Sequence, residues 1–256
     1  MAKGSQVGRY VWSAALLAGL PLILVAAFGC GGGSVSGPDP VAPPAPALEQ
    51  LPAPAVLRGR WAPGDQAALV PPGDNVVLLT PSYANDEPRE IARALAARHL
   101  PVIVYAGHIY VHPPSTWSGA WVNFAAYLEP FRAAGVLVGL QPLDEPRHMG
   151  YQDLVAAAHA DARARGYRVL ATEWADQVAG RWHTPRPPGT DWWAMTCTQY
   201  PGTMWTASRC GEALAERADV DALAAPGFDA GTGPPDRAAW TAAAGSKGLL
   251  WWETAE

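Results

Sequence analysis

Acidic and aromatic side chains follow several short apolar runs of this 256-residue chain. Asp144 and Glu145 follow one run, Glu173 and Trp174 end another, and Glu253 comes directly after the last. Two carboxyl groups can serve as proton donor and as base or nucleophile when their surroundings hold their pKa values apart. These residues therefore predict acid–base chemistry, provided that the fold brings them together.

The apolar runs alternate with amphipathic or alanine-rich stretches, a pattern typical of βα units and a parallel sheet. Gly135 and Gly166 follow two of the expected helices, as glycines often do just past a helix C-terminus. The alternative, an open doubly wound sheet, is disfavoured because no glycine-rich phosphate loop follows the first run. The eight expected strands are Val56–Trp61, Asn75–Thr80, Pro101–Ala106, Val136–Leu140, Arg168–Thr172, Trp192–Thr198, Val220–Ala225 and Gly248–Trp252.

Eight strands with intervening helices predict an α/β fold, a compact (β/α)8 TIM barrel over residues 56–256. Four residues follow Trp252, so we expect the barrel to lack its final helix. The active site of such a barrel lies at the C-terminal ends of the strands, where the βα loops converge. The sequence therefore predicts a single mouth that gathers the carboxyl groups with His108, after the third run, and Tyr200, after the sixth.

The run Asp144-Glu145-Pro146 resembles the Asn-Glu-Pro that ends the fourth strand of clan-A glycoside hydrolases. The resemblance implies hydrolysis of a glycosidic bond in a carbohydrate by two carboxyl groups, with Glu145 as the proton donor. Asp144 departs from the family's Asn, and the seventh run leads to Asp229 rather than to a glutamate nucleophile. Residues at positions where such enzymes contact substrate are His108, Asp144, Tyr200, Trp251 and Trp252, and Trp174 is a further expected substrate contact because it lies at the rim after the fifth run.

Three acidic residues could be the second carboxylate. Glu253 is favoured because it lies across the expected mouth, beside two tryptophans; Glu173 is the second choice and Asp229 the third. The alternative function is a catalytically inactive barrel that binds a surface glycan or a protein partner. The missing strand-seven glutamate and the absent final helix favour that alternative.

The N-terminal 29 residues have the charged, apolar and small-residue regions of a secretory signal. The box Ala27-Phe28-Gly29-Cys30 resembles that of bacterial lipoproteins, which implies cleavage before Cys30 and a lipid on its thiol. An uncleaved membrane anchor is the alternative, since about 18 apolar residues can just span a bilayer. Either way we expect an exported domain, and Gly31 after the cysteine favours the outer membrane of the cell envelope.

Residues 30–55 are rich in Gly, Pro and Ala, which predicts a disordered or extended tether between the signal and the barrel. Apart from Cys30, the cysteines of the chain are Cys197 and Cys210. In an oxidising compartment they could form a disulfide, with two buried free thiols as the alternative.

The net charge of the chain indicates which classes of partner it can bind. Lys and Arg number 18 against 23 Asp and Glu, a formal charge of −5, so no basic excess is present to neutralise a phosphate backbone. A nucleic-acid partner is therefore not expected. His108, Asp144 and Glu145 are residue types that could hold a metal ion, but no recognised metal-ligand spacing is present, and neither a metal nor another cofactor is expected.

Overall fold

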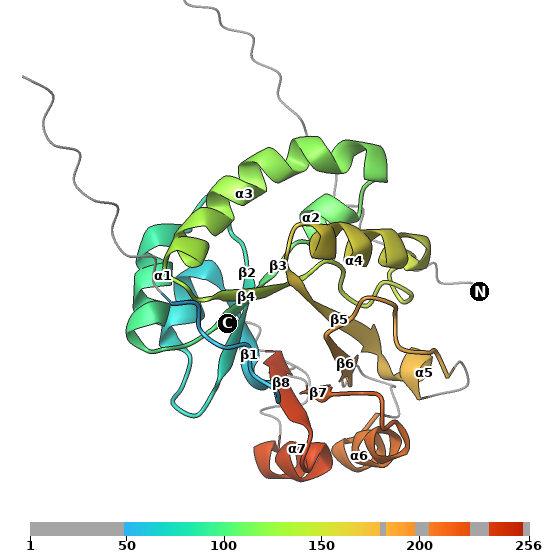
Figure 1. Cartoon of the computed structure of the whole chain (residues 1–256). Helices are drawn as coiled ribbons and strands as arrows, with labels where there is room; N and C mark the ends of the chain where they lie inside the picture. Colours follow the sequence, from blue (N-terminus) through green and yellow to red (C-terminus); the bar gives the residue numbers. More distant parts are fainter. Residues whose placement is uncertain (1–48, 180–182, 198–204, 226–235, 253–256) are drawn as a thin grey trace, which may run out of the picture. The chain divides into compact units, whose positions relative to one another are not determined.

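The computed structural model describes residues 49–179, 183–197, 205–225 and 236–252. Within them eight parallel strands pair in chain order and close into a barrel, with β1 hydrogen-bonded to β8 (Figure 1). This confirms the predicted TIM barrel, and every expected run overlaps one strand. The strands are β1 (Arg58–Pro63), β2 (Val76–Thr80), β3 (Val102–Tyr105), β4 (Leu137–Gln141), β5 (Arg168–Trp174), β6 (Trp192–Thr196), β7 (Ala222–Ala225) and β8 (Gly248–Trp252).

The helices lie outside the ring of strands (Figure 1). Two short helices that the sequence did not predict, α2 and α5, follow the C-terminal ends of β3 and β5. The α-helices are α1 (Pro88–Ala97), α2 (Gly107–Tyr110), α3 (Trp117–Ala133), α4 (Val155–Ala164), α5 (Ala175–Val178), α6 (Ala207–Glu216) and α7 (Arg237–Ala244). The 3-10 turns are η1 (Gly64–Leu69), η2 (Pro114–Thr116) and η3 (Gln152–Leu154).

Strand alternation divides the apolar side chains into two layers. On β5, Leu170 belongs to the cluster inside the barrel, whereas Val169 and Ala171 belong to clusters that pack against the helices. Trp192 and Leu250 fill the interior from β6 and β8. Because both faces of the sheet are buried, the strands read as continuous apolar runs, and a polar residue that points inward stands out.

Residues 49–55, the last part of the predicted tether, pack against the barrel. The Leu51 N–H donates to the Gly135 carbonyl at 2.7 Å, and the Trp192 indole donates to the Pro54 carbonyl at 3.1 Å. Gly135 has φ +68°, and a Cβ there would lie 2.7 Å from the Glu49 carbonyl oxygen. Residues 49–55 are called the strap below. A glycine is therefore required at position 135 both to end α3 and to leave room for the strap.

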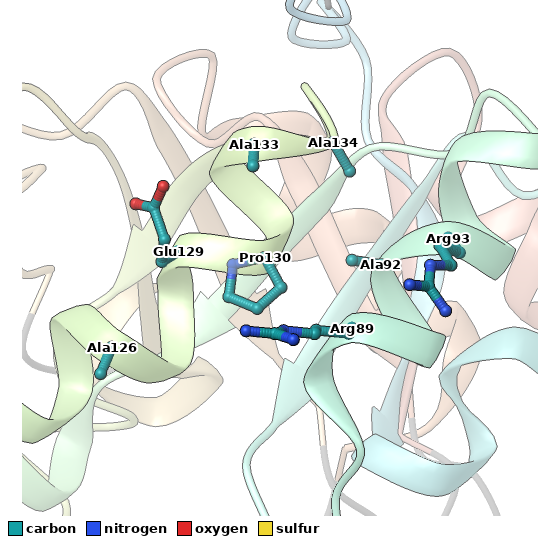
Figure 2. A pocket seen from close by; sticks show the side chains of 8 residues that line it. All are labelled: Arg89, Ala92, Arg93, Ala126, Glu129, Pro130, Ala133 and Ala134. Atoms are coloured by element: carbon teal, nitrogen blue, oxygen red, sulfur yellow. The ribbon is translucent and has the colours of Figure 1, made fainter. Parts of the chain in front are cut away.

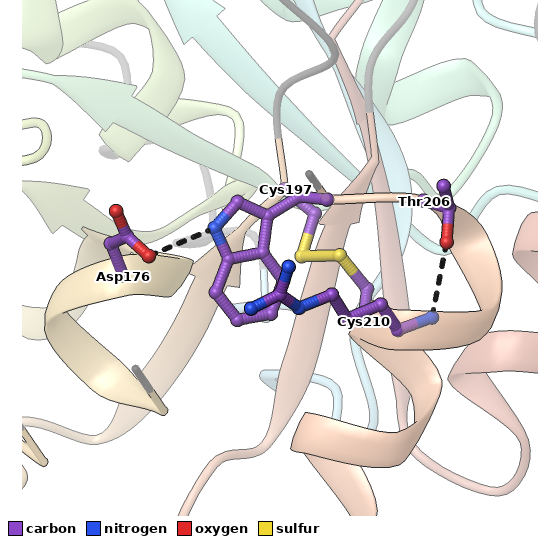
Figure 3. Close-up of a disulfide and its surroundings, with 6 residues drawn as sticks. Asp176, Cys197, Thr206 and Cys210 are labelled. Carbon is purple, nitrogen blue, oxygen red and sulfur yellow. Dashed lines mark hydrogen bonds between the residues drawn. A yellow bond between two sulfur atoms is a disulfide. The ribbon is translucent and has the colours of Figure 1, made fainter. Parts of the chain in front are cut away.

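A disulfide joins Cys197, just after β6, to Cys210 in α6 (Figure 3). This confirms the predicted pair, and both cysteines are fully buried. The Thr206 hydroxyl caps α6 by accepting the Arg209 N–H at 3.3 Å. A cross-link over 13 residues contributes about 3 kcal/mol by the loop-entropy relation. It fixes the start of α6 to the strand end nearest the barrel mouth.

Candidate active site

Asp144 lies in the loop after β4, where inward polar side chains hold it. Its Oδ1 accepts hydrogen bonds from the Thr172 hydroxyl at 2.8 Å and from the Gln141 amide at 3.0 Å. Gln141 is oriented in turn because its Oε1 accepts the Trp61 indole N–H at 3.0 Å. Burial raises the pKa of Asp144 to about 6, and the bonds from Thr172 and Gln141 oppose a larger rise. Asp144 is therefore mostly ionised at pH 7.

Glu145 has a strained backbone, with φ at +41°. A non-glycine residue in this region costs on the order of 1–3 kcal/mol, and such strain concentrates at functional sites. Burial raises the pKa of the half-buried Glu145 to about 8, and the charges of Asp144 and Glu173 add to the rise. The nearby Thr196 hydroxyl opposes this rise in pKa, although the hydroxyl makes no hydrogen bond of normal geometry. Glu145 is therefore mostly protonated at pH 7.

Glu173, at the end of β5, is only 2% exposed. Its carboxylate accepts the backbone N–H groups of Arg147 at 3.2 Å and Trp174 at 3.1 Å, and it lies 3.9 Å from the Arg147 guanidinium. Burial raises its pKa to about 7, and these donors oppose the rise. By alternation Glu173 leaves the strand on the same side as Ala171, which packs in the outer layer. Glu173 therefore lies outside the barrel interior and holds the loop after β4 through its contacts with Arg147.

The predicted tryptophans occupy different places. Trp252 points into the barrel and stacks on Trp61, with ring centroids 4.3 Å apart and planes 4° from parallel. Trp174 packs against His148 of the β4 loop, with ring centroids 4.6 Å apart. Trp251, which we expected to contact substrate, packs in the outer cluster beneath the Arg237 guanidinium and is only 7% exposed. Alternation explains this correction, because neighbours of an inward residue face outward.

His108 lies in α2, on the loop after β3, and is paired with a residue that the sequence reasoning missed. A hydrogen bond of 2.6 Å joins its Nε2 to the Tyr83 hydroxyl, and its ring packs on Phe124 at 4.9 Å. Burial, with a smaller contribution from His112, lowers the pKa of His108 to about 4, so it is neutral at pH 7. Tyr83 is 51% exposed, and its place just after β2 was the signal that could have found it.

Three buried donors at the C-terminal ends of the strands have no hydrogen-bond partner in the protein: Trp174 Nε1, Thr196 Oγ1 and Trp252 Nε1. Trp174 and Thr196 are paired in register on β5 and β6, so they lie at the same level of the barrel. An unsatisfied buried donor costs about 1–3 kcal/mol, and one in a native structure calls for an explanation. The sequence reasoning missed Thr196, together with Gln141 and Thr172; polar residues at inward strand positions were the signal.

The structure thus brings together Asp144, Glu145 and Glu173 at one end of the barrel. Tyr200, Glu253, Asp229 and Cys30 lie outside the described residues, so their expected roles stay predictions. In the described ranges, no group of three His, Cys, Asp or Glu side chains is arranged to hold a metal ion. Nor does any helix in these ranges have the length and apolar character needed to cross a membrane.

A surface groove lies apart from these residues, between α1 and α3 (Figure 2). Arg89 and Arg93 of α1 and Glu129 and Pro130 of α3 are among the residues that line it, and the Arg89 side chain extends toward Pro130. None of the predicted catalytic or substrate-binding residues lines this groove.

No family model matches the chain, and no curated protein matches it. Among solved structures it is similar to the GH26 domain of an endo-beta-mannanase/endo-beta-glucanase from Prevotella bryantii, with TM-score 0.49 and 10% identity over 78% of this chain and 85% of that one. It is also similar to a family 2 AP endonuclease from Brucella melitensis, with TM-score 0.39 and 13% identity over 76% of this chain and 92% of that one.

A third similar structure is a fusion of a xylose isomerase-like TIM barrel with 4-hydroxyphenylpyruvate dioxygenase. The TM-score is 0.45 at 12% identity, over 78% of this chain and 39% of that one. The chain therefore spans about two fifths of that protein's length. At these identities the likeness concerns the TIM-barrel fold alone, because one barrel hosts many unrelated activities.

Proposed function

We propose that the barrel mouth is the active site of a glycoside-hydrolase-like enzyme in which Glu145 donates the proton. One observation carries this proposal: the loop after β4 places two adjacent half-buried carboxyl groups at the mouth, one held by Thr172 and Gln141 and the other on a strained backbone. The pKa of Asp144 is about 6, whereas that of Glu145 is about 8. Titratable neighbours whose surroundings separate their pKa values are typical of acid–base pairs.

In this mechanism the Glu145 carboxyl protonates the oxygen that leaves when the bond to the anomeric carbon breaks. Positive charge then develops on the sugar ring, and the ionised Asp144 beside Glu145 stabilises it. The Glu145 carboxylate is next available to take a proton from water. Glu253 stays our predicted second carboxylate, since Glu173 is already occupied by two backbone N–H groups.

The test compares Glu145→Gln with Glu216→Gln, a change at an exposed residue of α6. Plant, fungal and bacterial polysaccharides are screened by release of reducing ends. We expect Glu145→Gln to lower turnover of the cleaved polysaccharide by roughly 10²–10⁴-fold, and Glu216→Gln to leave it unchanged. Circular dichroism checks that both variants fold.

Leaving-group dependence separates a proton donor from a nucleophile. On a dinitrophenyl glycoside of the same sugar, whose leaving group needs little protonation, Glu145→Gln should lose far less activity than on the polysaccharide. Equal losses on both substrates, or full activity of the variant, would refute the role of Glu145.

A second candidate is a catalytically inactive barrel that binds a surface glycan. The burial of Glu173 and its two backbone N–H donors favour it, because they suit a structural carboxylate better than a reacting one. Binding of a polysaccharide by both the unaltered protein and Glu145→Gln, with no release of reducing ends by either, would support this alternative.

We also propose, from the N-terminal sequence, that the domain is exported and attached to the cell envelope through a lipid on Cys30. Attachment of this kind would hold the enzyme near envelope or extracellular glycans.

A further inference from the structure

The loop after β4 places an arginine near Glu145 whose guanidinium makes no close contact with the protein. The side chain of Arg147 is 42% exposed, and it donates no hydrogen bond to any described residue. The nearest carboxylate oxygen, on Glu173, lies 3.9 Å from the Arg147 Nε, which is beyond hydrogen-bond distance. The N–H donors of this guanidinium are therefore left for a ligand.

Other arginines of the described residues are paired much more closely. Arg163, Arg186 and Arg217 each lie 2.6, 2.8 and 2.9 Å from a carboxylate oxygen. Arg147 differs because Glu173 holds its backbone instead, with Oε2 accepting the Arg147 N–H at 3.2 Å. Glu173 is buried and Arg147 is exposed, so this contact fixes the residue in place and leaves the guanidinium facing solvent.

Arg147 is also close to the proposed proton donor. It follows Glu145 by two residues, so their Cα atoms are at most roughly 7 Å apart. The loop is compact, because the Met149 N–H donates to the Glu145 carbonyl at 2.9 Å. Glu173 lies against Arg147, and its charge contributes to the raised pKa of Glu145, so both residues adjoin one carboxylate. An anion held by Arg147 can therefore belong to a sugar next to the bond that Glu145 protonates.

The charges at the mouth indicate which ligand needs this arginine. Asp144 is mostly ionised at neutral pH, and the Glu173 carboxyl has a pKa of about 7. An anionic ligand would be repelled by these carboxylates unless a cation faced it, whereas a neutral ligand needs no such cation. A guanidinium matches a carboxylate through two parallel N–H···O bonds, which give direction as well as affinity.

We propose that the substrate is a polysaccharide that contains 4-linked hexuronic acid, and that Arg147 binds the carboxylate of the uronic acid on the leaving side of the cleaved bond. This inference rests on the proposed function of Glu145. A 4-linked hexuronic acid carries its carboxylate on C5, next to C4, whose oxygen leaves. The sugar thus presents a leaving oxygen beside a carboxylate, and the loop presents an acid two residues from a guanidinium.

The reaction is hydrolysis. The bond between the anomeric carbon and O4 of the uronic acid breaks, its electron pair stays on O4, and O4 takes the Glu145 proton. Water adds to the anomeric carbon and returns a proton to the Glu145 carboxylate. The uronate carboxylate and Arg147 keep their charges throughout, and no double bond forms in the uronic acid. Arg147 is therefore a specificity residue that binds substrate and transfers no proton.

The experiment uses the full chain and polymers that differ in one group. Polygalacturonate, alginate and hyaluronan all contain uronic acid linked through O4, and each is compared with its carboxyl-reduced form. Carrageenan serves as a sulfated polymer without uronic acid. Reducing ends report cleavage, and ultraviolet absorbance of an unsaturated uronate reports elimination instead of hydrolysis. We expect at least one uronate polymer to be hydrolysed, and its carboxyl-reduced form to have a kcat/KM lower by roughly 10–100-fold.

Three variants test the contact. Arg147→Gln should raise KM for the cleaved polymer by roughly 10–100-fold with little change in kcat, and Arg147→Lys, which keeps the charge but not the paired donors, should fall between. Arg93→Gln removes one positive charge from the groove between α1 and α3 and should change neither constant. Calorimetry with a hexasaccharide of that polymer, in the Glu145→Gln background so that it is not consumed, should show the same order of affinities. Circular dichroism checks that each variant folds.

The outcomes separate this inference from the proposed function. Equal cleavage of carboxyl-reduced or sulfated polymers, an unchanged KM for Arg147→Gln, or an equal loss in Arg93→Gln would overturn the inference and leave Glu145 as the proton donor. Uronate binding that depends on Arg147, with no cleavage or with an unsaturated uronate as product, would uphold the recognition and refute the hydrolase. No binding and no cleavage of any polymer, including those of the first screen, would overturn both.

Discussion

Replacing Glu145 by Gln should stabilise the fold at alkaline pH while it abolishes the proposed catalysis. Burial raises the pKa of Glu145 from 4.5 to about 8. Between these values the folded protein keeps a proton that the unfolded chain has lost, so ionisation favours unfolding. The stability of the unaltered protein is therefore highest, for this group, below about pH 4.5 and is lost as the pH rises toward 8. Glutamine has no proton to lose and lacks this penalty.

The magnitude follows from the pKa values. One pKa unit corresponds to about 1.4 kcal/mol, so the penalty accumulated by pH 8 is on the order of 3–5 kcal/mol. Asp144 and Glu173 also have raised pKa values, but they are present in both proteins and largely cancel in the comparison. The gain of the variant should be near zero at pH 4.5 and grow steadily up to pH 8.

The assay is urea unfolding of both proteins, with the disulfide intact, at pH 5, 6, 7 and 8. Glu216→Gln serves as a control whose difference from the unaltered protein should not vary over this range, because Glu216 is exposed. A Glu145→Gln difference that is flat with pH, or a variant less stable than the unaltered protein at pH 8, would show that Glu145 is not buried as described.

Three further predictions concern catalysis, the disulfide and the anchor. The pH profile of kcat/KM should be bell-shaped, falling below about pH 6 as Asp144 gains a proton and above about pH 8 as Glu145 loses one; a rate that still rises beyond pH 9 contradicts the assignment. Cys210→Ser should lower the free energy of unfolding by about 3 kcal/mol in chemical denaturation, and an unchanged midpoint would contradict it. Cys30→Ser should abolish incorporation of labelled palmitate by bacteria that express the full chain, and labelling that persists would exclude lipidation at Cys30.

The strands were predictable because a barrel buried on both faces needs apolar runs, and each run overlaps a strand. Helices α1, α3, α4, α6 and α7 were predictable from the amphipathic or alanine-rich stretches between the runs, and α3 and α4 also from the glycines that follow them. The short α2 and α5 were not, because four-residue helices leave no periodic pattern. The tether was predicted to reach residue 55, since composition does not reveal that the strap accepts and donates backbone hydrogen bonds.

At the mouth, the position of Asp144, Glu145 and Glu173 after a strand was sufficient to predict that they lie there. It was not sufficient to predict how the hydrogen bonds and burial of each carboxyl group differ. The direction of a side chain depends on strand register, which placed Trp252 inside the barrel and Trp251 outside it. Register and hydrogen bonding also decided that Glu173 is held by backbone N–H groups. These properties come from contacts between strands far apart in sequence, and short motifs do not record them.

The strap also fixes the point at which the chain enters the domain. It runs beneath the N-terminal ends of β4 and β6, where Gln50 donates to the Leu137 carbonyl at 2.8 Å and Pro54 accepts from Trp192. Glu145 and its neighbours lie at the opposite ends of the strands. The described part of the chain therefore enters the domain at the N-terminal end of the barrel, opposite the residues around Glu145. A force applied to the chain at residue 49 would therefore act on the N-terminal end of the barrel, through the hydrogen bonds of the strap, and not on the residues around Glu145.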